Sequence, residues 1–106
     1  MSEKAKRKNE VLIALQQALL GEIGCRIRTI IVKYTNASIH FDVYVDGEIL
    51  EEDRESMMQV DTELVAASPS SHTISHDVIR LDAPASIPKE DIWVYCRREP
   101  IDTKKL

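Results

Sequence analysis

The stretch at residues 26–45, RIRTIIVKYTNASIHFDVYV, carries the clearest signal for β-structure in the chain. Its second half places apolar side chains at every other position: Ile39, Phe41, Val43 and Val45. A period of two predicts strands with one buried face, so residues 26–34 and 38–45 are expected to form a hairpin. Residues 35–37 supply the turn. Asp46-Gly47 ends the second strand, because glycine tolerates a positive φ.

Helical periodicity lies on both sides of this hairpin. Residues 9–20 carry leucines at the spacing of one helix face, which predicts an amphipathic helix ending at Gly21. Residues 1–8 before it are expected to fray. A second helix is predicted over residues 51–67, with acidic residues in the first turn, where the helix dipole stabilises them. Its apolar stripe consists of Leu50, Met57, Val60 and Leu64.

Two more strands are predicted after this helix, at residues 73–81 and 91–98. Prolines between them exclude a regular helix there. The order α-β-β-α-β-β predicts an α+β fold, in which an antiparallel four-stranded sheet of two hairpins is packed by two helices. The 106 residues are expected to form a single domain, because halves of about 50 residues would bury too little surface. Residues 100–106 are expected to fray.

Composition and charge exclude several classes of function. The chain has a formal net charge of −4 and only 5% aromatic residues, which disfavours nucleic acid as a direct ligand. The basic residues 1–8 and the apolar run at residues 11–20 imitate a lipoprotein signal. Glu22, however, occupies a position where such a cleavage site needs an aliphatic residue. No run reaches the roughly 20 apolar residues of a membrane span, so a soluble, cytoplasmic protein is expected.

Cysteine and histidine spacings give no support for a metal site. Cys25 and Cys96 lack the spacing of zinc ligands and are expected to be small buried hydrophobes in a reducing compartment. His72 and His76 are four positions apart, but on a strand they would lie about 13 Å apart, too far for one metal ion. They are therefore predicted to be exposed. A metal protein or small enzyme using these histidines with Asp77 is the least favoured hypothesis.

Catalytic motifs are also missing from the sequence. The three glycines form neither a phosphate loop nor a dinucleotide fingerprint. No glycine-rich elbow surrounds any serine, threonine or cysteine, as a catalytic nucleophile would require. We expect a protein without a catalytic site, a metal or a cofactor.

Acidic residues concentrate in one segment of the chain. Residues 42–64 hold nine acids and one base, a net charge of −8, whereas the remainder is +4. Such a field steers a basic partner, and the predicted partner-binding residues are Asp42, Asp46, Glu48, Glu51, Glu52, Asp53 and Glu55. The alternative is a solvated helix face. Calcium is a weaker option, because the segment lacks the alternating ligands and the glycine of an EF-hand loop.

Basic and aromatic residues gather near the last strand. Arg97 and Arg98, with Arg26 and Arg28 of the first strand, either form an opposing basic patch or protect sheet edges from aggregation. Strand alternation places Trp93 and Tyr95 on one face.

Four stretches together resemble a known family: ALQQALLGEI at residues 14–23, VDGEI at 45–49 before the acidic residues 51–55, VIRLDAP at 78–84, and WVYCRR at 93–98. Over about residues 9–99 the chain resembles small bacterial immunity proteins of contact-dependent growth inhibition and related polymorphic toxin systems. The resemblance implies a cytoplasmic antidote that binds a cognate toxin C-terminal domain, most often a nuclease, and occludes its active or substrate-binding site. It carries over no residue roles, so the acidic interface rests on charge.

One alternative function stays open, that of a non-catalytic regulatory or adaptor module that binds a host protein, for example by sheet-edge pairing. The sequence is compatible with a monomer and with a homodimer.

Overall fold

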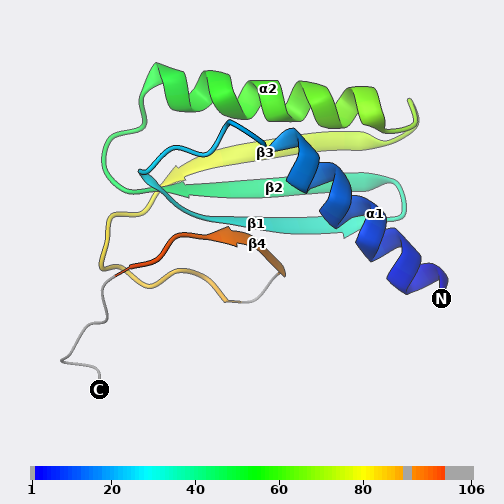
Figure 1. Ribbon diagram of the computed structural model, residues 1–106, viewed down its shortest axis with the longest axis horizontal. Helices are drawn as coiled ribbons and strands as arrows, with labels where there is room; N and C mark the ends of the chain where they lie inside the picture. The colour runs from blue at the N-terminus through cyan, green and yellow to red at the C-terminus, as the bar shows by residue number, and fades with distance from the viewer. Residues whose placement is uncertain (1, 90–91, 100–106) are drawn as a thin grey trace.

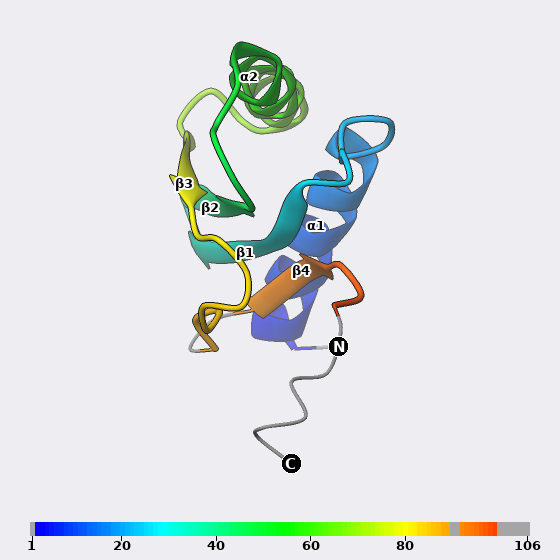
Figure 2. The ribbon, with the colours of Figure 1, turned by 90° about the vertical axis from the view of Figure 1, so that its left-hand side faces the viewer.

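A computed structural model describes residues 2–89 and 92–99. The elements are α1 Glu3–Ala18, β1 Ile27–Thr35, β2 Ser38–Val45, α2 Glu51–Ala67, β3 Thr73–Arg80 and β4 Ile92–Cys96. Their order is the predicted one, and the α+β class is confirmed (Figure 1). The strands form one open sheet in the order β3-β2-β1-β4. Both helices lie on the same, concave face of this sheet (Figure 2).

The first hairpin forms as predicted. β1 and β2 pair antiparallel, and the pairing ends at Thr35 and Ser38 beside a tight turn. Gly47 has a φ of 89° directly after β2, which confirms the backbone conformation expected of the Asp46-Gly47 pair. The helix α2 also has its predicted bounds. Each of these elements follows from a pattern among residues that are only a few positions apart in the sequence.

The expectation of a purely antiparallel sheet is wrong, because β2 and β3 pair parallel. The intervening helix explains this. α2 has 17 residues and spans about 25 Å, close to the roughly 26 Å of an eight-residue strand. It therefore returns the chain to the end where β2 began. There the amide of Thr73 donates a hydrogen bond of 2.9 Å to the carbonyl of Ala37, next to the start of β2.

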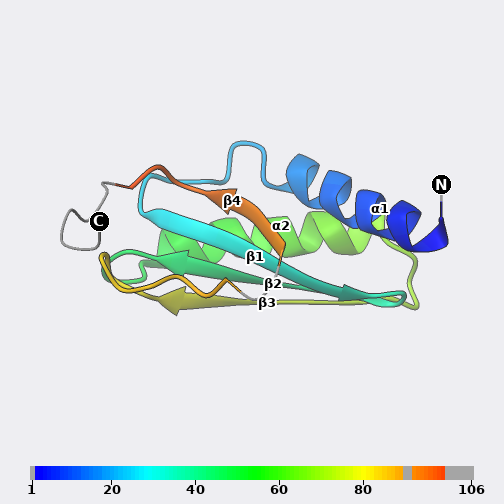
Figure 3. The same cartoon turned by 90° about the horizontal axis from the view of Figure 1, so that it is seen from below.

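The predicted second hairpin, between the last two strands, is also wrong. β3 and β4 lie at opposite edges of the sheet, and β4 pairs antiparallel with β1. The segment after β3 carries the chain from one edge toward the other (Figure 3). A proline-rich segment of this length connects distant edges as readily as neighbouring strands, so local sequence left the partner of β4 undetermined.

The helix α1 begins at Glu3, six residues before the predicted start. The Ser2 hydroxyl accepts a hydrogen bond of 3.1 Å from the Ala5 amide and caps the helix. Arg7 donates from Nε to the Thr35 carbonyl at 3.0 Å, which fixes these first turns to the hairpin. The expected fraying of residues 100–106 falls outside the described residues. Within the described residues, neither helix is long and apolar enough to cross a membrane.

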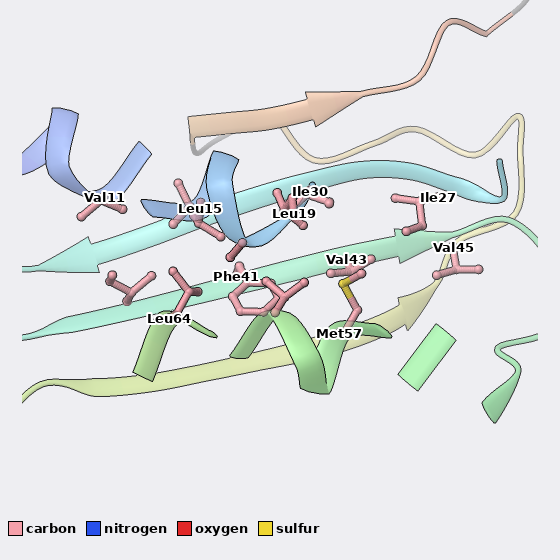
Figure 4. Packing of buried hydrophobic residues seen from close by; sticks show 14 residues of the cluster. Val11, Leu15, Leu19, Ile27, Ile30, Phe41, Val43, Val45, Met57 and Leu64 are labelled. Atoms are coloured by element: carbon pink, nitrogen blue, oxygen red, sulfur yellow. The ribbon is translucent and has the colours of Figure 1, made fainter. Parts of the chain in front are cut away.

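The core lies between the helices and the concave face of the sheet (Figure 4). Leu15 from α1, Phe41 from β2 and Leu64 from α2 are each 0% exposed. Aliphatic residues fill most of the remaining volume, as a chain with few aromatics requires. Burial of the alternate residues of β2 confirms the pattern that predicted this strand.

Irregular pairing at two points changes which way side chains face. In β1, Ile27 pairs with Val45 and Thr29 pairs with Tyr44, two consecutive residues of β2. Arg28 is therefore the extra residue of a β-bulge and has no partner in the β1–β2 register. In β4, Val94 is extra in the same way, because its two neighbours Tyr95 and Trp93 pair with consecutive residues of β1.

The bulge in β4 overturns the expectation that Trp93 and Tyr95 share a face. Tyr95 packs against the core, while Trp93 is 39% exposed and donates its indole N–H to the Pro88 carbonyl at 3.0 Å.

Candidate partner-binding surface

The predicted acidic residues divide into two groups in the structure. Three of them have partners within the protein: Asp42, Asp46 and Asp53. The other four are exposed at the end of the β2–α2 loop and in the first turns of α2: Glu48, Glu51, Glu52 and Glu55. The segment of net charge −8 is therefore not one continuous surface. Some of its acids, including Asp53 and Asp61 within α2, serve the fold, and others on the same helix face solvent.

Asp46 belongs to an ionic network that connects the ends of three strands. Its Oδ2 accepts a hydrogen bond of 2.7 Å from Arg97 Nη2, and its Oδ1 accepts one of 3.1 Å from the Ala83 amide. These contacts hold the pKa of Asp46 below its usual range, with the Arg97 bond as the larger cause. Arg97 also donates to Glu99, at 2.9 Å, and to the Cys25 carbonyl, at 3.0 Å.

The same network buries Arg28. This side chain donates two hydrogen bonds to the carboxylate of Glu99 and a third, of 2.9 Å, to the Leu81 carbonyl. The pKa of Glu99 falls to about 2, first because of Arg28 and also because of Arg97. The arginines at 26, 28 and 97 thus have internal acidic or carbonyl partners. They do not form the open basic patch that was one of two interpretations of the sequence.

Asp53 completes the start of α2. Its Oδ2 accepts a hydrogen bond of 2.8 Å from the Leu50 amide, which satisfies one of the free N–H groups at the helix N-terminus. The same oxygen forms an ion pair with Arg26, and Arg26 also donates to the Glu48 carbonyl at 2.6 Å. Asp53 therefore positions the helix against the start of β1. A role for it in partner binding competes with this structural role.

Asp42 lies on the convex face of the sheet, beside residues that sequence reasoning did not connect with it. His40 Nε2 is 2.9 Å from Asp42 Oδ1 and 3.5 Å from Asp77 Oδ2, and His40 Nδ1 is 2.7 Å from the Ser75 hydroxyl. One ring nitrogen of His40 and one carboxylate oxygen from each of Asp42 and Asp77 lie within 4.8 Å of one another. Parallel pairing brings Asp77 directly beside Asp42, a relationship invisible in the sequence.

His76 faces the opposite way and is not the exposed histidine that was predicted. Its ring stacks on Phe41 with centroids 5.1 Å apart, and its Nδ1 is 2.7 Å from Asp61 Oδ2 of α2. His72 is half-buried before β3. Because His76 faces the helices and Asp77 the convex face, the set of His72, His76 and Asp77 does not converge on one site.

The cysteines are exposed and free, contrary to the expectation that both are buried. Cys25 lies in the loop before β1. Cys96 is the last residue of β4, which is an edge strand of the sheet. Both positions are outside the core, which the aliphatic residues of the sheet and helices fill.

The carboxylates of Glu51, Glu52 and Glu55 make no ion pair or side-chain hydrogen bond with any residue that the structure describes. Arg54 is the one basic residue among them, and it too is exposed. Glu48 differs slightly, because its charge contributes to the raised pKa of Arg80. Free carboxylates on a rigid helix are well placed to meet positive charge on another molecule.

A cleft of about 310 Å³ lies beside these carboxylates. One wall is the α1–β1 loop, with Glu22 and Ile23, and the other is the start of α2, with Glu52 and Met57. Sequence reasoning missed Glu22, since its charge lies outside the segment 42–64. Only the folded chain brings this loop against α2.

A family model described as MafI2 immunity protein matches residues 8–99. No curated protein matches the chain. The family match covers every strand and α2, together with most of α1.

Proposed function

The chain belongs to the MafI2 immunity protein family, and from that membership we propose that it is the antidote to one cognate toxin domain, a basic nuclease. It binds this domain one to one in the cytoplasm and occludes the active or substrate-binding site. It acts by binding alone, without catalysis, a metal or a cofactor, and it contacts neither nucleic acid nor a membrane. The earlier resemblance to immunity proteins of polymorphic toxin systems is confirmed by the family.

The observation that carries the nuclease proposal is the group of exposed carboxylates at the start of α2. Nucleases hold positive charge where they bind phosphate, so a carboxylate-rich surface competes for the same electrostatic site. Glu51, Glu52 and Glu55 have this exposure and are free of internal partners among the described residues. Of the seven residues predicted from sequence, these three and Glu48 support the proposal best.

The test is co-expression with the toxin domain encoded beside this gene. Tagged toxin domain should retain the protein in a one-to-one complex, and the protein should rescue growth of cells that produce the toxin. A nuclease assay then shows whether cleavage stops when the two proteins are equimolar. Loss of growth rescue, or full cleavage in the presence of a stoichiometric complex, would contradict occlusion of the toxin.

An adaptor function for a host protein is the second candidate. It is supported by β3, an eight-residue strand at an edge of the sheet, which offers backbone groups to an added strand. Capture of a host protein from cells that lack the toxin gene, with no binding to the toxin domain, would favour this function over the antidote.

A further inference from the structure

We propose that the cleft between the α1–β1 loop and the start of α2 receives an arginine or lysine side chain of the toxin domain. The inference rests on the proposed antidote function and assigns the central contact of its interface. It concerns a different set of groups from the helix carboxylates alone, because most of the residues that line the cleft come from the α1–β1 loop and the first residue of β1.

The shape of the cleft suits one long side chain. Figure 1 shows the α1–β1 loop running beside the first turns of α2, and the cleft between them measures about 310 Å³. This volume is at the lower limit for small-molecule and cofactor pockets, which run from about 300 to 1,000 Å³. Ile27 and Met57, both almost fully buried, line the interior, and the half-buried Ile23 lines the loop side.

Charge in the cleft favours a cation. Glu22 on the loop and Glu52 on α2 line it from opposite sides, and neither makes an ion pair within the described part of the chain. Asp53 also lines the cleft, but its charge is balanced by Arg26. The net charge left for a partner is therefore that of the two glutamates. In the free protein, the positive end of the α2 dipole stabilises the carboxylate of Glu52.

The combination of apolar interior and charged walls selects the class of ligand. Arginine and lysine lay an aliphatic stem along apolar surface and place a charged group at its end. Ile23 and Met57 would contact the stem, while Glu22 and Glu52 would accept hydrogen bonds from the charged group. Arginine offers five donors in a planar fork, so it can bond both carboxylates at once. A basic nuclease surface carries such side chains.

The test uses the complex of full-length protein with its toxin domain. The double variant Glu22→Gln and Glu52→Gln keeps the size of both side chains and removes their charge. The affinity should fall by at least about 30-fold, mainly through faster dissociation, since a desolvated charge pair loses one partner. The matched control is Glu3→Gln with Glu63→Gln, two exposed helix glutamates that lie outside the cleft and outside the predicted partner-binding residues, and it should change affinity only a few-fold.

Thiol labelling gives a second readout that does not depend on charge. Cys25 lines the cleft and is exposed, so bound toxin should slow its reaction with a maleimide in a Cys96→Ser background. Cys96, labelled in a Cys25→Ser background, should be protected much less, because it lies on β4 and is not among the residues that line the cleft.

The outcomes separate the two proposals. If the toxin domain binds the wild type, and binds the cleft variant as tightly as the control variant while Cys25 stays reactive, the cleft proposal is wrong. The antidote function would still stand. No binding by the wild type overturns the antidote function, and the cleft proposal falls with it. Selective loss in the cleft variant together with protection of Cys25 establishes both.

Discussion

The carboxylate of Glu99 receives two parallel hydrogen bonds from Arg28, of 2.7 and 2.8 Å, across 71 positions of the chain. Arg28 is 2% exposed, and it is the extra residue of the bulge near the start of β1. The pair joins the segment after β4 to β1, an inner strand of the sheet. The exposed fractions of the two side chains are 3% for Arg28 and 22% for Glu99, so little water screens the pair.

Replacement of Glu99 by glutamine should lower the free energy of unfolding by about 2–3 kcal/mol, since it leaves the charge of Arg28 buried without a counter-charge. Urea denaturation measures the change. Glu63→Gln, on the exposed side of α2, is the control and should stay within about 0.5 kcal/mol of the wild type. Equal stability of the two variants would show that Arg28 is well solvated.

The carboxyl group of Glu99 also makes the free energy of unfolding depend on pH in the acidic range. The pKa of Glu99 is about 2 in the folded protein, against an ordinary value of 4.5, and the pKa values of Asp46 and Asp82 are also lowered. Groups with a lowered folded pKa stabilise the protein above the unfolded pKa and lose this effect as the pH falls. Unfolding free energy should therefore decline from about pH 5 toward pH 2. The Glu99→Gln variant should show a shallower decline over that range; an identical slope would assign the acid dependence to other groups.

His76 should contribute to stability through its contacts with α2 and the core. His76→Ala removes the hydrogen bond to Asp61 and the stacking on Phe41, and we expect a loss of about 2 kcal/mol. Asp77→Asn changes the neighbouring residue on the other face, whose side chain is 67% exposed, and should cost no more than about 0.5 kcal/mol. Thermal unfolding of both variants checks the assignment of faces. A greater loss in Asp77→Asn would reverse it.

Asp53 should act chiefly on folding. Asp53→Ala removes the acceptor for the Leu50 amide and the partner of Arg26, and we expect it to destabilise the protein by about 1–2 kcal/mol. Asp53→Asn keeps an acceptor at the helix start and should recover part of this loss. Amide hydrogen exchange in the first turn of α2 would show whether the effect is local. Full stability in Asp53→Ala would free this residue for a role in binding.

Reversal of the free carboxylates should slow association with the toxin domain. A triple lysine variant at Glu51, Glu52 and Glu55 is expected to bind at least about tenfold more slowly at low salt, with the difference shrinking as salt rises. Stopped-flow measurements at several ionic strengths test this.

The control for that experiment matches the change in total charge. It carries lysine at Glu3, Glu10 and Glu63, three exposed positions away from the start of α2. Slowing of both variants to the same extent would mean that net charge, and not this surface, steers the encounter.

Local patterns in the sequence determined the elements of this protein. The alternation at residues 38–45, the Asp46-Gly47 turn and the helical stripe at residues 51–67 depend on neighbours a few positions apart, and each was predicted correctly. Glu51, Glu52 and Glu55 were selected from the charge of their segment, and the structure places all three at exposed positions of α2, while their role in binding stays a prediction. The resemblance to immunity proteins rested on short stretches of the same kind.

Only the tertiary structure decided how these elements meet. The parallel pairing of β3, the place of β4 at the far edge and the contact of Asp46 with Arg97 join residues that lie far apart in the chain. Such pairings depend on the length of a crossover helix and on bulges that shift the register, neither of which a local pattern records. For this reason the sequence could supply the acidic residues, while the fold decided which of them remain free to bind a partner.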